Sequence, residues 1–516
     1  MKKKHVFSLF ISVLFYFTAY AQANWNLQIS DEINEGTKSS IKKCLGASGS
    51  YNYFLRYTYS KKGIYSVEKY DEEMRLVNSV DLDIQSRDVE SKYLNAYLMG
   101  SNIYIFSSCW IKEKELNVID VVQVDAKSCT LKGVKTDAIV LNAKWPVTWS
   151  IKTSYNYSFI SFYGETQYDA KAQNKDMFYL LDKNLQLKWT LIMDGENGKD
   201  DYDFIDYSIG NSGDVVMAID FYNTSAGKYK YNGTGFIRED SHEDHEIVLR
   251  SIQPSDGLPH DHVVSDEYLN DKTKFRMKVF ALSSGKSIAF LTYKKDDYAL
   301  DIIEFNPLDT AKLNIYTSVV PKLVSQSMHL KAMRDMYFDL TYSDFNMSDL
   351  YEKEDGSLIL CGQEYKQIGE QGVYGNLLDL DAYYGQLITV YINTSLQVDD
   401  WVVVPRYHFV EKDWTNLGVN ISYVDGSVCY LLNDNIKNSN ATKPADPTVK
   451  FDPYHFALYL IVVDRNQIVR KTLISNEDDF DVNFRPSKAQ YVLDKGFILY
   501  GTKGSHARLG TFYVEQ

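Results

Sequence analysis

Four of the nine histidines fall within 21 residues, at His242, His245, His260 and His262. Imidazoles beside carboxylates are ligands that zinc and other divalent cations accept, and Glu243, Asp244 and Asp261 accompany these histidines. The intervening residues 246–251 predict a strand, however, and six strand residues at about 3.3 Å each would separate the two pairs by roughly 20 Å. One ion could not bind all four. We therefore expect polar turns at both ends of a strand, with a metal site as the alternative.

Adjacent carboxylates occur at three places, Asp200-Asp201, Asp399-Asp400 and Asp478-Asp479. Such pairs could act as catalytic carboxylates or bind calcium. None lies in a calcium-loop pattern with its glycine and closing glutamate, so solvated turns are the favoured interpretation. The chain also lacks a Gly-x-Ser-x-Gly elbow, a Walker loop and a His-Glu-x-x-His motif. The sequence therefore predicts no catalytic, cofactor-binding or metal-binding residue.

The five cysteines include no C-x-x-C pair that would indicate a redox or zinc site. In an oxidising compartment they could form disulfides, although an odd number leaves at least one thiol free. Cys109 and Cys129 end two neighbouring predicted strands and are the pair most expected to be bonded. Cys361 and Cys429 lie in apolar strands, where a free cysteine behaves as a small buried hydrophobic residue.

The elements that must position these residues are set by a repeat, a turn glycine followed by a short apolar strand. Its clear copies are 72, 71, 70 and 70 residues apart, at Gly213, Gly285, Gly356, Gly426 and Gly496. Weaker copies start at Gly49, Gly100 and Asn156, which makes eight. Asp355-Gly356 and Asp425-Gly426 predict tight hairpins because glycine adopts a positive φ without steric cost. Asn156 fits the same position, since asparagine tolerates the left-handed conformation.

Each copy has a second half, in which an apolar strand runs into an Asx turn and a further strand follows. Residues 181–189, with Asp182 at the turn, are the clearest case, and residues 70–76, 124–131 and 463–469 align with them. An Asp or Asn side chain closes such a turn by bonding to its own backbone two residues on. Every unit therefore predicts four short strands, and helical periodicity is nearly absent. The fold class predicted is all-β, a β-propeller of four-stranded blades.

The number of blades follows from two counts that disagree. About 495 residues divided by a period of roughly 70 gives seven blades. The early units are shorter, at 51, 56 and 57 residues, and counting them directly gives eight. Eight blades are favoured and seven are the alternative. The last unit ends where its Asx turn would begin, so residues 25–29 are expected to supply its missing strand and close the ring, which removes the open sheet edges.

This pattern of Asp-Gly, apolar strand, second strand and Asp-x-Asn resembles that of secreted bacterial β-propellers of unassigned function, of the kind found in Bacteroidota. The resemblance implies a fold but no activity, because propellers host binding, signalling and catalysis alike. The Ser-x-Asp-x-Gly-x-Thr-Trp boxes of sialidase-type propellers are absent. Trp189 lies where quinone-dependent dehydrogenase propellers place a docking tryptophan, but their adjacent cysteines are missing. We therefore expect Trp189 to be a core residue.

The charge composition limits the classes of partner that the protein can be expected to bind. Lys and Arg total 55 against 69 Asp and Glu, a net charge of −14 that repels nucleic-acid phosphates and anionic lipids. We expect no nucleic-acid partner and no cofactor. The 41 tyrosines and 25 phenylalanines favour half-buried pleated surfaces, in agreement with an all-β fold.

The first 23 residues are expected to be a cleaved secretory signal. Three lysines precede an apolar run from Val6 to Tyr20, and Ala21 and Ala23 each end a small-x-small cleavage site. A retained membrane anchor is the alternative, and no later segment is apolar enough to span a bilayer. The mature protein would then be a single β-propeller domain, residues 24–516, that is secreted, periplasmic or on the cell surface.

Three units have long polar insertions between their second and third strands, at residues 223–244, 367–384 and 437–455. Equivalent connections of a propeller emerge on one face, so these aromatic and polar segments are expected to gather there as a binding surface. Tolerated surface insertion is the alternative. The favoured function is an exported, non-catalytic binding or scaffold module for protein or glycan. A glycan hydrolase or lyase with carboxylates at the axial mouth, and a structural part of a cell-surface assembly, are the alternatives.

Overall fold

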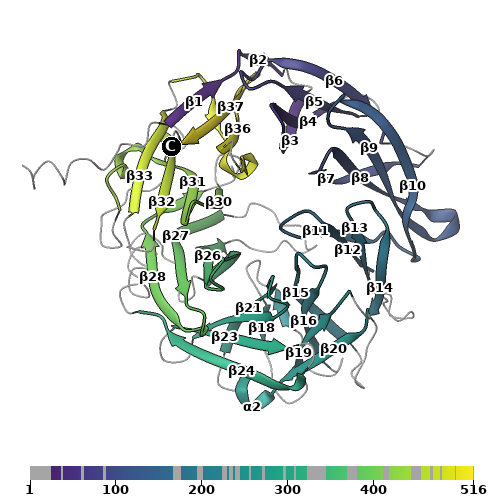
Figure 1. The fold of residues 1–516 in the computed structure, drawn as a ribbon, viewed down its shortest axis with the longest axis vertical. Coiled ribbons are helices and arrows are strands. Elements are labelled where there is room, and N and C mark those ends of the chain that lie inside the picture. Colours follow the sequence, from purple (N-terminus) through teal and green to yellow (C-terminus); the bar gives the residue numbers. More distant parts are fainter. Residues whose placement is uncertain are drawn as a thin grey trace, which may run out of the picture.

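The chain forms a ring of eight antiparallel sheets, seen end-on in Figure 1, in a computed structural model. The described residues are 25–35, 39–59, 63–84, 89–166, 176–193, 201–222, 229–231, 236–238, 245–254, 257–269, 273–294, 298–306, 309–321, 344–368, 381–410, 418–442, 452, 455–464, 469–476, 479–493 and 496–514. The sequence prediction of eight blades is therefore confirmed, and seven is wrong.

The first four blades are meanders of four strands each. Blade 1 contains β3 (Ser39–Ser48), β4 (Tyr51–Thr58), β5 (Ile64–Tyr70) and β6 (Leu76–Leu82). Blade 2 contains β7 (Ser91–Met99), β8 (Asn102–Ile111), β9 (Leu116–Asp125) and β10 (Thr130–Asn142), and blade 3 contains β11 (Thr148–Thr153), β12 (Phe159–Glu165), β13 (Asp176–Asp182) and β14 (Leu187–Met193). Blade 4 contains β15 (Asp201–Ile209), β16 (Val215–Tyr222), β19 (His245–Ile252) and β20 (Pro259–Val264). A separate hairpin, β17 (Tyr229–Tyr231) with β18 (Phe236–Arg238), lies between β16 and β19 in the sequence.

The remaining blades follow the same order, and a short helix, α2 (Asp266–Leu269), links blades 4 and 5. Blade 5 contains β21 (Thr273–Ala281), β22 (Ser287–Lys294), β23 (Tyr298–Asn306) and β24 (Asp309–Val319). Blade 6 contains β25 (Asp344–Glu352), β26 (Leu358–Ile368), β27 (Asp381–Ile392), β28 (Val398–Val404) and the short β29 (His408–Val410), and blade 7 contains β30 (Val419–Val424), β31 (Ser427–Asn435), β32 (Phe456–Val463) and β33 (Val469–Asn476). Blade 8 contains β34 (Asn483–Phe484), β35 (Gln490–Val492), β36 (Gly496–Lys503) and β37 (His506–Val514).

The two ends of the chain close the ring, as the sequence predicted. β1 (Trp25–Ile29) pairs antiparallel with β37, from Trp25 opposite Val514 to Ile29 opposite Gly510. β1 is thus the fourth strand of blade 8, and β2 (Ile33–Asn34) adds a second contact with β37.

The repeat glycines act as turn residues. All five clear copies have a positive φ, and Val424 pairs with Ser427 across Asp425-Gly426, the two-residue hairpin that Asp-Gly predicts. The prediction for Asn156 is wrong, because Tyr157 takes the positive φ of 54° instead. The Asn156 side chain is used elsewhere, since its Oδ1 accepts a hydrogen bond from the Ser158 amide at 3.0 Å. The Asx turns are confirmed, for example at Asp182, whose Oδ1 accepts from the amides of Asn184 and Gln186.

The hydrophobic core lies between adjacent blades, because each meander buries both faces against its neighbours. Ile359 and Cys361 of blade 6, for example, pack in one cluster with Tyr430 and Leu432 of blade 7, and all four are nearly inaccessible to water. Each such apolar side chain contributes about 1.5–3 kcal/mol when it is fully buried.

Tyrosine hydroxyls tie blades together, which explains part of the tyrosine excess. The Tyr53 hydroxyl of blade 1 donates to the Ala126 carbonyl of blade 2 at 2.6 Å. In the same way Tyr104 of blade 2 reaches the Lys183 carbonyl of blade 3, and Tyr391 of blade 6 reaches the Val463 carbonyl of blade 7. In each case the acceptor lies at the end of the third strand of the next blade. Tyrosine suits this place because its ring packs in the core while its hydroxyl needs a partner.

The expected disulfide between Cys109 and Cys129 is wrong. All five cysteines are described and buried, and none of them is in a disulfide. Cys109 lies opposite Val118 near the end of β8, whereas Cys129 follows the far end of β9, beyond Asp125. Seven strand residues separate the two levels, about 23 Å. A disulfide bridges Cα atoms less than about 7 Å apart.

We expect the five thiols to resist alkylation in the folded protein. Burial raises the pKa of Cys44 and of Cys429 to about 12, so almost no thiolate forms at pH 8. Iodoacetamide at pH 8, followed by intact-mass measurement, should add no label to native protein within an hour and five labels in guanidinium. A denatured, unreduced sample that accepts fewer than five labels would contradict the free-thiol state.

Among the described residues, none of the helices has the length and apolar character needed to cross a membrane.

Candidate functional site

The structure places His245 far from His260. His245 begins β19, and His260 and His262 lie in β20 opposite Ser251 and Leu249. His245 and the level of His260 are six residues apart along β19, about 20 Å, as predicted. His262 is fully buried with its ring edge-on to Phe305 of blade 5. His242 lies outside the described residues, and within those residues no group of three or more His, Cys, Asp or Glu side chains is placed to hold a metal ion.

Among the described residues, Asp479 lies in a turn as predicted, but Asp399 and Asp400 lie in β28 and Asp201 begins β15, so the prediction of turns is wrong for these three. Asp399 accepts a hydrogen bond from the Asn393 amide group at 2.8 Å, and Asp479 accepts one from the Asn476 backbone at 2.7 Å. Asp200 and Asp478 lie outside the described residues. Trp189 is a core residue, as expected: it belongs to the outer strand of blade 3, is 8% exposed and stacks on Phe178 with ring centroids 5.5 Å apart.

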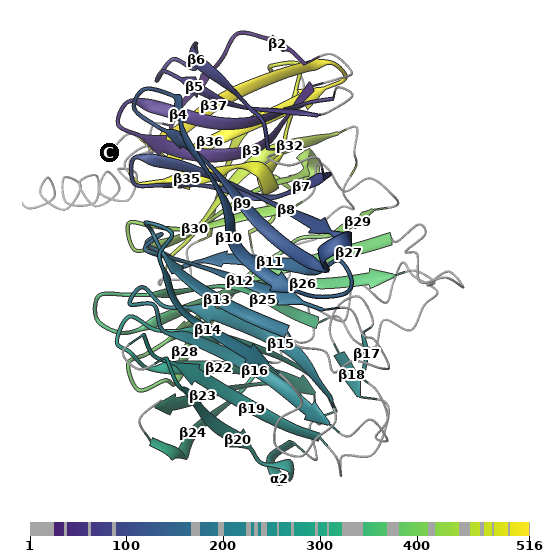
Figure 2. The ribbon, with the colours of Figure 1, turned by 90° about the vertical axis from the view of Figure 1, so that its right-hand side faces the viewer.

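The long connections between second and third strands leave the ring on one side, which we call the insert face. In Figure 2 the hairpin β17–β18 of blade 4 and the β27–β29 end of blade 6 project from the same side. The ladder of β26 and β27 runs on into the blade 6 insertion, to the pair Ile368 and Asp381. The other parts of the three insertions that are described are residues 437–442, 452 and 455, and the rest lies outside the described residues. The opposite side, where the turn glycines connect first and second strands, is the hairpin face.

A cleft of about 410 Å³ lies between blades 3 and 4 and begins at the insert face. Glu165 ends β12 and Asp176 begins β13, so both flank a connection of that face. We call this cavity the blade 3–4 cleft, and it is lined by Thr148, Ser150, Lys152, Tyr163, Glu165, Asp176, Tyr202, Asp203, Phe204, Ile205, Asp206 and Tyr207. Four carboxylates and four aromatic rings therefore share one concave surface.

The wall of the cleft is rigidly built around Asp176. Its Oδ2 accepts from the Tyr163 hydroxyl at 2.6 Å, and its Oδ1 accepts from the Thr166 backbone at 2.8 Å. The Tyr163 ring stacks on Phe204 of blade 4 with centroids 4.4 Å apart. Burial, followed by the negative charge of Asp176, raises the pKa of the Tyr163 hydroxyl far above its usual value. The hydroxyl stays protonated and keeps the carboxylate oriented.

The floor of the cleft carries a cation. The Lys152 ammonium lies 2.8 Å from Asp206 Oδ1, 2.6 Å from the Tyr207 carbonyl and 4.1 Å from the centre of the Tyr207 ring. At the rim, loss of water around the Glu165 carboxylate, and then the charge of Asp176, raise the pKa of Glu165. Glu165 is exposed at the mouth and Asp203 lines the same cleft, while Asp176 accepts hydrogen bonds from Tyr163 and Thr166 and Asp206 accepts one from Lys152.

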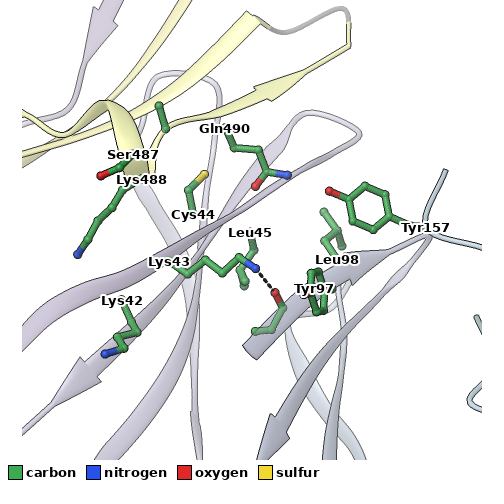
Figure 3. A pocket seen from close by; sticks show the side chains of 12 residues that line it. Lys42, Lys43, Cys44, Leu45, Tyr97, Leu98, Tyr157, Ser487, Lys488 and Gln490 are labelled. Atoms are coloured by element: carbon green, nitrogen blue, oxygen red, sulfur yellow. Dashed lines mark hydrogen bonds between the residues drawn. The ribbon is translucent and has the colours of Figure 1, made fainter. Parts of the chain in front are cut away.

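A second cavity of about 390 Å³ is lined by residues of blades 8, 1, 2 and 3. Two of the contributing strands, β3 and β7, are the innermost of their blades and face the centre of the ring in Figure 1. We call this second cavity the axial lysine cavity (Figure 3), and it is lined by Lys42, Lys43, Cys44, Leu45, Ala96, Tyr97, Leu98, Tyr157, Ser487, Lys488, Ala489 and Gln490. Tyr157 belongs to the connection between β11 and β12, so this cavity lies toward the hairpin face. Neither cavity has a signal in the sequence, because each is assembled from residues of different blades.

Comparison with known proteins gives the fold alone. No known protein family and no curated protein sequence matches the chain. Among solved structures it is similar to the β-propeller domain of the Trilobed protease from Pyrococcus furiosus, with 8% identity and a TM-score of 0.37 over 86% of this chain and 100% of that one. It is also similar to the WD40 domain of SCAP from fission yeast, with 11% identity and a TM-score of 0.37 over 94% and 98% of the two chains. A polysaccharide lyase of the PL25 family, an ulvan lyase, gives 10% identity and a TM-score of 0.36 over 86% and 96%.

Proposed function

We propose that this protein is an exported, non-catalytic glycan-binding module that takes its ligand in the blade 3–4 cleft. The single observation that carries the proposal is the concave surface on the insert face, where aromatic rings and carboxylates alternate. Export rests on the N-terminal signal that the sequence predicts. A protein ligand, which needs about 800 Å² of surface on each partner, is less suited to a cavity of this size.

The chemistry of the cleft suits a sugar ring. Sugar hydroxyls donate to carboxylates, and Glu165 places one at the mouth of the cleft, which Asp203 also lines. The C–H face of a pyranose packs on an aromatic ring, and Tyr202 and Phe204 offer two such rings from the inner strand of blade 4. The stacked rings and the hydrogen-bonded Asp176 already have fixed positions. Binding would therefore cost little free energy for ordering the side chains of the cleft.

A second candidate function, glycan hydrolysis, is favoured by one observation. Glu165 has a raised pKa beside Asp176, as a general acid beside a second carboxylate would have. Three hydrogen bonds from Tyr163 and Thr166 hold Asp176, however, which makes it a poor nucleophile or base. Binding without turnover is therefore the function that the cleft supports better.

Removal of a carboxylate charge from the cleft should weaken glycan retention. We expect at least one of four soluble polysaccharides (a β-1,3-glucan, xylan, galactomannan or dextran) to retard the protein in affinity electrophoresis. Glu165→Gln and Asp203→Asn should each weaken that retardation about tenfold, since hydrogen bonds to charged groups contribute about 1.5–3 kcal/mol. Glu354→Gln, the same change at an exposed site on the hairpin face, is the matched control and should change nothing.

Two outcomes would count against the proposal. If none of the four polysaccharides retards the protein, or if Glu354→Gln weakens retention as much as Glu165→Gln, the cleft is not the binding site. Release of reducing ends or of unsaturated products, lost in Glu165→Gln, would instead establish the catalytic alternative.

A further inference from the structure

The lining of the blade 3–4 cleft contains more negative charge than its one cation can neutralise. Four of the twelve lining residues are carboxylates, and Lys152 is the one cation among them. The Lys152 ammonium lies 2.8 Å from Asp206 Oδ1 and 2.6 Å from the Tyr207 carbonyl. The lining therefore contains three carboxylates beyond the one that Lys152 contacts.

The register of blade 3 places two of these carboxylates opposite each other. Gly164 pairs with Met177, so the next residues along the two strands, Glu165 of β12 and Asp176 of β13, are opposite one another. Side chains directly opposite in antiparallel strands lie on the same face of the sheet, with Cβ atoms about 4.5–5.5 Å apart, and like charges in this arrangement repel. Thr148 of β11 is opposite Glu165 on the other side. The mouth of the cleft therefore holds a row of one hydroxyl and two carboxylates.

The one cation of the lining is too far from this row to neutralise it. Lys152 follows Thr148 by four strand residues along β11, about 13 Å. Asp176 accepts a hydrogen bond from the Tyr163 hydroxyl, which is a neutral donor. Burial of the Glu165 carboxylate, and then the negative charge of Asp176, raises the pKa of Glu165. A positive charge placed in this row would therefore relieve the repulsion between the two carboxylates.

Aromatic rings lie beside the row of carboxylates. Tyr163 is two residues before Glu165 on the same face of β12, and its ring stacks on Phe204 of blade 4 with centroids 4.4 Å apart. Tyr202 lines the cleft from the same strand as Phe204. The face of an aromatic ring attracts a cation within about 6 Å of its centre, and it also packs on the C–H face of a pyranose. A sugar that carries a positive charge would therefore meet both kinds of surface that the cleft offers.

The arrangement suits an ammonium group better than a metal ion. In the part of the chain that the structure describes, no three His, Cys, Asp or Glu side chains converge to hold a metal ion. An ammonium has three N–H donors and can bond to Glu165 while its charge also acts on Asp176. Hydrogen bonds to ionised groups are about twice as strong as those between neutral groups. An ammonium at the mouth would therefore bind more tightly than a hydroxyl in the same position.

We infer that the blade 3–4 cleft selects glycans that contain an unacetylated amino sugar, with the ammonium group at Glu165 beside Asp176 and the pyranose ring against Tyr202 and Phe204. This inference rests on the proposed glycan-binding function and names the class of glycan that the cleft takes. A neutral glycan would also pack on the rings and donate to the carboxylates, but it would leave the repulsion between the two carboxylates in place.

Three disaccharides that differ only at C2 of each ring test the inference, by calorimetric titration of the purified protein. They are β-1,4-linked diglucosamine, which carries ammonium groups, its di-N-acetylated form, and cellobiose, which carries hydroxyls. Diglucosamine should bind at least tenfold more tightly than either neutral sugar, because a charge-assisted hydrogen bond replaces a neutral one. The titrations are made at about 0.15 M salt, where attraction between distant charges is screened.

Glu165→Gln should lower the preference for diglucosamine over cellobiose to about threefold or less. Glu165 is exposed, so this variant should fold as the native protein does. Glu354→Gln is the matched control, because it removes the same charge from an exposed site on the hairpin face, and it should leave the preference unchanged. Acetyl-lysine amide, which carries an ammonium but no pyranose, should bind at least threefold more weakly than diglucosamine.

Three results would overturn the inference. They are equal binding of diglucosamine and either neutral disaccharide, the same preference in Glu165→Gln and Glu354→Gln, and tighter binding of acetyl-lysine amide than of diglucosamine, which would indicate a basic peptide. The proposed function can be judged separately. Retention of a neutral polysaccharide that Glu165→Gln weakens, without any preference for diglucosamine, overturns this inference alone. If no polysaccharide and no disaccharide binds, both are overturned.

Discussion

Replacing Arg56 with Met is expected to lower the free energy of unfolding by about 3–5 kcal/mol. The Arg56 guanidinium bonds to Glu68 at 2.6 Å and to Glu35 at 3.1 Å, and all three side chains are at most 10% exposed. Without the cation, two carboxylates would face each other away from water. Breaking a buried ion pair on one side is costly because the remaining charge stays buried.

Hydrogen bonds from neighbouring tyrosines hold both carboxylates in their buried positions. Tyr70 donates to Glu68 at 2.9 Å, and Tyr500 of blade 8 donates to Glu35 at 2.8 Å. Glu35 follows β2, the segment that joins the closing strand to blade 1. We therefore expect the loss of stability to appear first where the ring closes. The Arg56→Met substitution should accelerate amide hydrogen exchange more in β1 and β37 than in β22 and β23.

The matched control is Arg75→Met in the same blade. Arg75 pairs with Asp71 at 2.8 Å and Glu73 at 2.9 Å, but its side chain is 69% exposed. Exposed pairs contribute little, so unfolding in guanidinium should barely change. Adding Glu68→Gln to Arg56→Met should recover part of the loss, since one buried charge is then removed. Equal stability of Arg56→Met and Arg75→Met would falsify the argument.

The fold could be predicted because its signals are local. A turn glycine and an Asx residue each determine a conformation within four residues, and their spacing repeats with every blade. Closure could be predicted for the same reason, since the last unit visibly lacks a strand that residues 25–29 supply. A prediction from such a local signal can be wrong by one residue. In the third copy Tyr157, and not Asn156, adopts the positive φ.

The cavities could not be predicted because their residues meet only when different blades pack against one another. Lys42 and Lys488 are 446 positions apart in the chain, and no pattern within either blade relates them. Lys42 also depends on a bulge, which shifts the register that the alternation of apolar and polar residues predicts. The histidine cluster shows the converse, because residues close in sequence lie at opposite ends of a strand.

The second large effect is expected at a buried network between blades 6 and 7, on lowering the pH. His408 Nε2 lies 3.2 Å from Asp434 Oδ1, and the Lys471 ammonium lies 2.7 Å from Asp434 Oδ2. Arg406 Nε donates to His408 Nδ1 at 3.0 Å, so that nitrogen is an acceptor and the imidazole is neutral. Burial, then the charge of Arg406, lowers the pKa of His408 to about 4 against the opposing effect of Asp434.

The direction of the pH effect follows from this lowered pKa. Above pH 6.5 the imidazole is neutral in both states, so its contribution to stability is constant. Between pH 6.5 and 4 the imidazole of the unfolded chain binds a proton that the folded protein does not bind. The free energy of unfolding therefore falls by about 3 kcal/mol over this range. Burial by itself would raise the pKa of Asp434, but the hydrogen bond from His408 and the charge of Lys471 together outweigh it and lower this pKa, so the contribution of Asp434 to stability is lost only below about pH 3.8.

His408→Gln should flatten the dependence of the free energy of unfolding on pH between 6.5 and 4, even if it lowers stability at pH 8. Guanidinium unfolding at pH 8, 6.5, 5 and 4 measures both. His455→Gln is the matched control, because His455 also pairs with an aspartate, Asp452, but is 69% exposed. Carboxylates elsewhere titrate equally in both variants, so the difference between the two curves isolates His408. If the curves are parallel across this window, the imidazole is not held neutral, and the hydrogen bond from Arg406 to Nδ1 cannot be the one that sets its protonation.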